Sequence, residues 1–344
     1  MISNLASLGG YPAYSSYVNQ NYKTNVISSH HSIAFRGLEK DVVSFSSKPV
    51  ELNELSQNEK LALEFGKDLK VLVDSKNATA VEIQKLIQKH LGAGNVKIHS
   101  MSEYQQPNRP GIEMKKAAVT RPNFDATGKL INIDVFIPDI DYNNGNEVLA
   151  FLDKTTHEIT HVIQYTKSKE FLPHYAPTPE ARFMNFIQKR ITDRLTDKGV
   201  TDCAVAYIKE VNYPLKDTTD YDRFMDSVTD KVAPEKLSEI MKFGKDAVSQ
   251  KQTINAVFDL IFDETLKGMQ YEKDPNALAT IQKYGGMENF KAQIKAICVK
   301  SLKDEQEAYN AGNIMRKEVN GVAGKQTYND LISTLMGMYS QALS

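Results

Sequence analysis

The chain has 344 residues, a formal net charge of −1 at pH 7 and 25% charged residues, and its sequence contains no basic patch or aromatic-basic motif that would predict a nucleic-acid partner. Its 41% hydrophobic residues are sufficient for a core, and its length predicts about two lobes. No apolar run is long enough for a membrane span and no Sec signal is evident, so we expect a cytoplasmic protein or one exported by another route.

The first part of the chain has little periodicity. Residues 1–55 are rich in Ser, Asn and Tyr, so we expect a flexible extension, either a simple tail or a propeptide that covers a cleft. A helix is expected from Ser56 to about Asp74. A second helix is expected over Thr79–Leu91, where apolar residues recur at intervals of three and four.

Two strands are expected next. The first is short and covers Asn95–His99, after a glycine-containing turn. The second covers Leu130–Ile137, where Asn132 and Asp134 alternate with apolar residues that predict one buried face: Ile131, Ile133, Val135 and Ile137.

A helix that begins near Asn144 and runs from Glu147 to Phe171 carries the most informative residues of the chain, His157-Glu158-Ile159-Thr160-His161. Residues four apart lie on the same face of a helix, so both imidazoles can reach one metal ion. This H-E-x-x-H pattern is typical of zinc peptidases, in which the Glu serves as general base for a metal-activated water. The pattern also arises by chance in about one chain in a hundred of this length.

A catalytic zinc site needs a third protein ligand. A third His in the metzincin position is absent, because Lys167 stands there. The candidates are His174, Glu180, Glu305 and Glu307. Glu305 lies on the apolar stripe of its predicted helix, whereas Glu307 lies roughly 200° around the axis and is expected to be a solvated partner of Lys303. A carboxylate on a buried stripe must be paired, protonated or bound to metal, which favours Glu305.

Almost every segment after Glu147 has helical periodicity, with glycine or proline at the boundaries. The remaining expected helices are Arg182–Leu195, Asp202–Val211, Tyr221–Val232, Pro234–Ser249, Thr253–Met269, Asn276–Tyr284, Met287–Lys317 and Thr327–Leu343, and Gly199 is expected to separate the first two. Cys203 and Cys298 could form one disulfide. We therefore predict an α+β chain with an extension (1–55), an α+β lobe ending in the motif helix (56–170) and a helical lobe (171–344).

The H-E-I-T-H motif, with the later segment Glu305-Gln306-Glu307-Ala308, resembles the gluzincin metallopeptidases of the zincin fold. The resemblance implies one Zn²⁺ per chain held by His157, His161 and Glu305, with Glu158 as general base, and a protein or peptide substrate that pairs with an edge strand. Many gluzincins have an Asp four residues after the ligand Glu that orients a histidine, where this chain has Tyr309; Asp153 is a possible substitute. The segment His161-Val162-Ile163-Gln164 is also similar to uncharacterised H-E-x-x-H-x-x-Q proteins.

Three functions follow from these patterns. The favoured one is a zinc endopeptidase, and the alternatives are an inactive zinc-binding relative and a helical interaction protein with an accidental motif. The group that would stabilise an oxyanion is left open among Tyr165, His174, Tyr175 and Tyr309.

Overall fold

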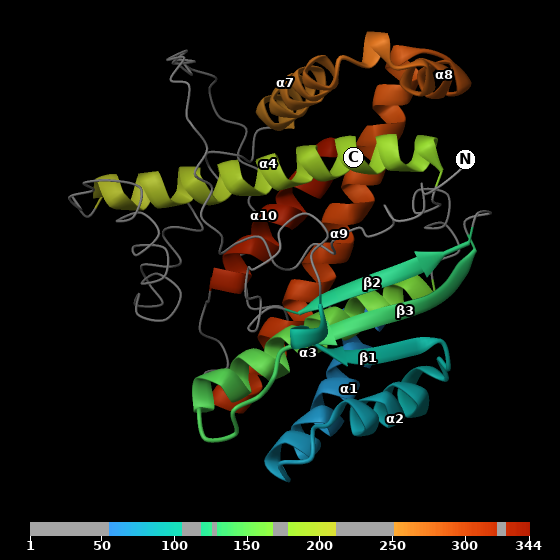
Figure 1. Cartoon of the computed structure of the whole chain (residues 1–344). Helices are drawn as coiled ribbons and strands as arrows, with labels where there is room; N and C mark the ends of the chain where they lie inside the picture. Colours follow the sequence, from blue (N-terminus) through green and yellow to red (C-terminus); the bar gives the residue numbers. More distant parts are fainter. Residues whose placement is uncertain (1–54, 105–117, 126–128, 168–177, 211–250, 322–327) are drawn as a thin grey trace.

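The computed structural model describes residues 55–104, 118–125, 129–167, 178–210, 251–321 and 328–344 (Figure 1). The elements in chain order are α1 (Gln57–Asp74), α2 (Ala80–Leu91), β1 (Val96–Ser100), η3 (Met101–Glu103), β2 (Val119–Phe124), β3 (Leu130–Ile137), α3 (Gly145–Lys167), α4 (Pro179–Glu210), α7 (Lys251–Met269), η5 (Tyr271–Lys273), α8 (Pro275–Lys283), α9 (Met287–Asn320) and α10 (Tyr328–Leu343). Most of the described elements are helices, and they accompany one small mixed sheet. This composition confirms the predicted α+β class. Residues 1–54 of the expected extension and the helices expected over Tyr221–Val232 and Pro234–Ser249 lie outside the described residues.

The sheet has the order β1-β3-β2, with β1 parallel and β2 antiparallel to β3. The alternation predicted for β3 holds for Ile133, Val135 and Ile137, which are buried, but not for Ile131, which is 57% exposed near the start of the strand. The sequence analysis did not anticipate β2, which has Pro122 in its middle. Proline is tolerated there because β2 lies at the edge of the sheet formed by the described strands, where it pairs with β3 alone.

The first hydrophobic core lies between the sheet and the helices α1, α2 and α3. Phe65 of α1, Ile83 of α2, Ile133 of β3 and Ile159 of α3 are fully buried in it. The sequential arrangement of two helices, strands and the motif helix is the one that the sequence predicts. The motif helix is therefore anchored through its apolar face.

The second hydrophobic core is entirely helical and is built from α4, α7, α8, α9 and α10. Helix α9 belongs to both cores (Figure 1): Phe290 and Leu302 are buried in the helical core, whereas Ala311 and Met315 are buried in the core beneath the sheet. Glu305 lies between these two stretches of α9. The residue favoured as third ligand thus lies where the two cores meet.

Gly199 does not end a helix, contrary to the sequence prediction. Helix α4 continues through it from Pro179 to Glu210. A Cβ at position 199 would lie 3.1 Å from Leu335 Cδ2 and would clash with the Tyr339 hydroxyl of α10. The glycine therefore permits close packing of α4 on α10 and is not a helix terminator.

Two further expectations concern the cysteines and the membrane. Cys203 and Cys298 are both buried and free, so the disulfide left open by the sequence is not formed. No helix in the described part of the chain combines the length and the apolar character needed to cross a bilayer.

Candidate metal centre

Helix α3 positions the H-E-x-x-H residues. Asn144 caps its start, since its side-chain oxygen accepts a hydrogen bond from the Asn146 amide at 3.1 Å, as the sequence predicts. From Phe151 to Gln164 almost every residue is buried, on the polar as well as the apolar face. The apolar face packs in the core beneath the sheet, and the polar face is covered by α9.

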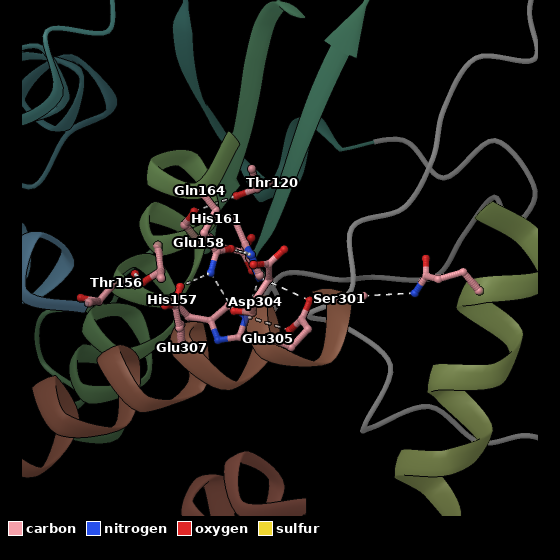
Figure 2. Close-up of polar contacts among 12 residues, drawn as sticks. Thr120, Thr156, His157, Glu158, His161, Gln164, Ser301, Asp304, Glu305 and Glu307 are labelled. Atoms are coloured by element: carbon pink, nitrogen blue, oxygen red, sulfur yellow. Dashed lines mark hydrogen bonds and ion pairs between the residues drawn. The ribbon is translucent and has the colours of Figure 1, made fainter. Parts of the chain in front are cut away.

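The imidazoles of His157 and His161 and the carboxylate of Glu305 converge between α3 and α9 (Figure 2). The two Nε2 atoms lie 3.2 Å apart. Glu305 Oε1 lies 3.4 Å from His161 Nε2, and Glu305 Oε2 lies 3.6 Å from His157 Nε2. Of the candidate third ligands among the described residues, Glu305 is the one that joins the motif, and it forms with the two histidines a group that could hold a metal ion.

The spacing and chemistry of these atoms fit a zinc ion. Ligands at about 2.0–2.2 Å from a tetrahedral ion are roughly 3.3–3.5 Å apart, close to the three separations observed. Two imidazoles and a carboxylate are also ligands that zinc accepts. All three side chains are nearly buried, with exposed fractions of 6%, 8% and 6% for His157, His161 and Glu305.

The pKa values show that the site accommodates positive charge. Burial, assisted by the charge of His161, lowers the pKa of His157. Burial would also lower the pKa of His161, but the facing carboxylate of Glu305 outweighs it and raises the pKa to about 10. Burial would raise the pKa of Glu305, yet the attraction of His161 lowers it. Near neutral pH the group holds one extra proton, on His161, in the place where a metal cation would bind.

The Glu158 side chain is completely buried, and neither of its carboxylate oxygens has a hydrogen-bond partner among the described residues. Its main-chain carbonyl accepts a hydrogen bond from Thr120 Oγ1 of β2 at 3.1 Å. An unpartnered buried carboxylate is costly, so such a group is typically kept for a ligand, a proton or a water.

Glu307 has a different environment from the one expected. Instead of being a solvated partner of Lys303, it is half-buried and accepts hydrogen bonds from Gln164 Nε2 and Asn58 Nδ2, both at 3.0 Å. Gln164 contributes to the site, although the sequence analysis assigned it no role. The signal that could have identified it is its position three residues after His161, which directs it toward the same neighbouring helix.

The other candidates in the described part of the chain lie outside the ligand group. Glu180 forms an ion pair with Lys283 at 2.6 Å and accepts a hydrogen bond from the Tyr284 hydroxyl at 3.1 Å. His174 and Tyr175 lie outside the described residues. Asp153, proposed to orient His157, instead accepts a hydrogen bond from Asn329 at 3.1 Å and lies 3.7 Å from Arg316.

Two tyrosines flank the imidazoles. The Tyr309 ring contacts His157 edge to face, with ring centroids 4.7 Å apart. The Tyr165 ring lies 6.4 Å from His161. Both candidates for oxyanion stabilisation in the described part of the chain are thus close to the ligands.

No protein-family model, curated protein or solved structure matches this chain.

Proposed function

We propose that the protein is a zinc-dependent peptidase of gluzincin type, with His157, His161 and Glu305 as ligands and Glu158 as general base. The observation that carries the proposal is the combination of this ligand group with a buried carboxylate that has no hydrogen-bond partner among the described residues. A structural metal site needs only its ligands, whereas a hydrolytic site also needs a base that is free to accept a proton.

Zinc, when bound, supplies a Lewis acid that polarises a carbonyl and lowers the pKa of water. Two neutral imidazoles and one carboxylate hold the ion without neutralising its charge. Glu158 takes the proton of the attacking water and passes it to the leaving amine, a role that needs a carboxylate in a poorly solvated place. Tyr309 or Tyr165 is placed to stabilise the oxyanion.

The edge strand β2 is the proposed place for the substrate backbone. Its Thr120 hydroxyl is hydrogen-bonded to the Glu158 carbonyl, so the strand lies directly beside the catalytic helix. An extended peptide can add to a sheet edge through main-chain hydrogen bonds. This arrangement supports a peptide substrate, in agreement with the resemblance to zincins.

One observation favours a second candidate, a zinc-binding protein without peptidase activity. Glu158 is 0% exposed and both histidines are almost fully buried, whereas hydrolysis requires access for substrate. The two candidates share the metal site and differ in turnover.

The first experiment is elemental analysis of the purified wild type beside His157→Ala and Glu305→Gln. One zinc per chain in the wild type, lost in both variants, supports the site, and no zinc after incubation with the metal overturns both zinc-based functions. Glu180→Gln is the matched control, which should retain the metal.

Activity is tested by incubating the zinc-loaded wild type with an unfolded protein and identifying new termini by mass spectrometry. Glu158→Gln should retain zinc but lose cleavage by at least about 10²-fold. Cleavage that persists in Glu158→Gln contradicts the mechanism. A zinc-loaded wild type that cleaves no unfolded protein favours the inactive zinc binder.

A further inference from the structure

Gln164 lies one turn after His161 on α3 and connects the ligand to α9. Its Oε1 is 2.8 Å from His161 Nδ1. Its Nε2 donates to the Asp304 main-chain oxygen at 2.9 Å and to Glu307 Oε2 at 3.0 Å (Figure 2). With 4% of its surface exposed, the side chain is nearly enclosed by these partners.

The two partners on α9 determine which way the Gln164 amide points. The Asp304 carbonyl carries no hydrogen and can only accept, and the Glu307 carboxylate oxygen already accepts from the amide of Asn58. The NH₂ group must therefore point toward α9. A flipped amide would place its oxygen against two acceptors.

The orientation of the amide decides which nitrogen of His161 carries hydrogen. With its NH₂ group on α9, Gln164 presents an oxygen to His161 Nδ1, and an oxygen can only accept. Nδ1 must then carry the hydrogen. In the neutral imidazole this leaves the lone pair on Nε2, the atom that faces His157 Nε2 at 3.2 Å and Glu305 at 3.4 Å.

We propose that Gln164 is a positioning residue that holds His161 in the Nδ1–H tautomer, with its Nε2 directed at the metal. The inference rests on the proposed metal site and explains how the ligand is prepared for it. Glu307 and Asn58 complete the arrangement, because Asn58 Nδ2 donates to Glu307 Oε2 at 3.0 Å and holds the carboxylate in place. Three helices, α1, α3 and α9, thereby set the tautomer of one ligand.

The same network explains why this site has no Asp four residues after Glu305. Outer hydrogen-bond partners of a ligand histidine are usually carboxylates or carbonyls, which raise its basicity and fix its ring. Here the acidic group is Glu307, and it acts on His161 through the intervening amide. Tyr309 occupies the position of that Asp and packs against the other histidine.

Zinc affinity by chelator competition is the first test, with Gln164→Leu and Gln188→Leu as a matched pair. Gln188 is a second buried glutamine at a helix interface, 6% exposed, and its amide donates to Ser301 of α9 at 3.1 Å and to Thr192 of α4 at 3.2 Å. We expect Gln164→Leu to bind zinc about 10- to 100-fold more weakly and Gln188→Leu to bind it like the wild type. Equal affinity in Gln164→Leu and the wild type overturns the proposal.

A conservative variant separates hydrogen bonding from packing. Glu307→Gln retains an oxygen that accepts from Gln164, so its zinc affinity should stay close to that of the wild type. Glu307→Leu removes the acceptor and should weaken binding. Equal losses in both variants would mean that the charge of Glu307 acts directly on the metal and would overturn the positioning role.

The tautomer is read by ¹⁵N spectroscopy of histidine-labelled protein, with the His161 signals assigned from a His161→Asn variant. A hydrogen on Nδ1 and zinc on Nε2 support the inference, and zinc on Nδ1 overturns it. If the wild type binds no zinc, the proposed metal site is wrong. The inference is then judged on the metal-free protein above the raised pKa of His161, where the imidazole is neutral: a hydrogen on Nδ1 supports it and a hydrogen on Nε2 overturns it.

Discussion

Gly312 of α9 lies directly against Asp153 of α3, with no room for a side chain between them. A Cβ at position 312 would be 2.6 Å from Asp153 Oδ1, 2.7 Å from the Asp153 main-chain oxygen and 3.3 Å from His157 Cβ. The glycine thus sets the separation of the two helices that supply the ligands. It lies two turns beyond Glu305 on the same buried stripe.

Gly312→Ala should therefore damage the site without touching a ligand. The added methyl group must push α9 away from α3, at a cost of about 1–3 kcal/mol in the free energy of unfolding, and the shift separates Glu305 from the histidines. We expect lower thermal stability and weaker zinc binding. The control is Gly268→Ala in α7, where nothing lies within 4 Å of the new Cβ and the fold should be unaffected or slightly stabilised.

Glu158→Gln should leave the metal-free fold at least as stable as the wild type, although it should abolish the proposed catalysis. The substitution removes a buried carboxylate that has no hydrogen-bond partner among the described residues and retains its shape. The check is thermal unfolding of both proteins after treatment with a chelator. A clear loss of stability in the variant would show that the Glu158 charge is satisfied and would remove the main support for its role as base.

Zinc binding should release about one proton and strengthen with pH. In the metal-free protein the pKa of His161 is raised to about 10, and its proton must leave before Nε2 can bind a metal. Affinity should then rise about tenfold per pH unit up to that pKa and level off above it. Titration calorimetry in buffers of different ionisation enthalpy counts the protons released on binding. Zinc affinity that is independent of pH would contradict a protonated His161 in the metal-free protein.

The ion pair between His161 and Glu305 should make the stability of the metal-free fold depend on pH. The contribution of His161 to the free energy of unfolding is fully present below the ordinary imidazole pKa of about 6.5 and is lost as pH rises through about 10. The contribution of Glu305, whose pKa is lowered, is present above its ordinary value and is lost as pH falls through the lowered one. The free energy of unfolding of the metal-free protein, measured across pH, should fall at both low and high pH. The His161→Asn variant should lack the fall at high pH.

Neither cysteine should react in the folded protein. Cys298 is buried in the helical core, and burial raises the pKa of its thiol, so the reactive thiolate is scarce at neutral pH. Cys203 is equally buried. A chromogenic thiol reagent should label both residues in denaturant and neither in buffer; rapid labelling of the native protein would contradict the packing of α9 against α4.

The sequence predicted those parts of the site that depend on one helix at a time. The spacing of His157 and His161, and the position of Glu305 on an apolar stripe, follow from helical periodicity alone. The role of Glu307 was predicted wrongly, because it depends on how α9 is aligned against α3 and α1. The orientation of the Gln164 amide requires the same knowledge, since its two acceptors belong to a helix that is distant in sequence.

For the fold as well, the sequence predicted the elements that depend on local pattern and missed those that depend on tertiary packing. Amphipathic helices and the alternating strand β3 were anticipated, but β2, which has Pro122 in its middle, was not, and Gly199 suggested a break in α4. Each residue has a conformational preference that tertiary packing overrides: an edge of a sheet accepts proline, and a tight helix crossing needs glycine. A single chain read from end to end does not show which of its positions will be edges or crossings.

The dependence of the site on both α3 and α9 also has a consequence for biosynthesis. The two histidines leave the ribosome long before Glu305, and at about 5–20 residues per second the delay is on the order of ten seconds. During this interval α3 has no cover for its polar face, and a captured metal would have only two of its three ligands. Loading of the proposed metal would therefore report the completion of folding, and a nascent chain interrupted before α9 would expose an incomplete site to chaperones and proteases.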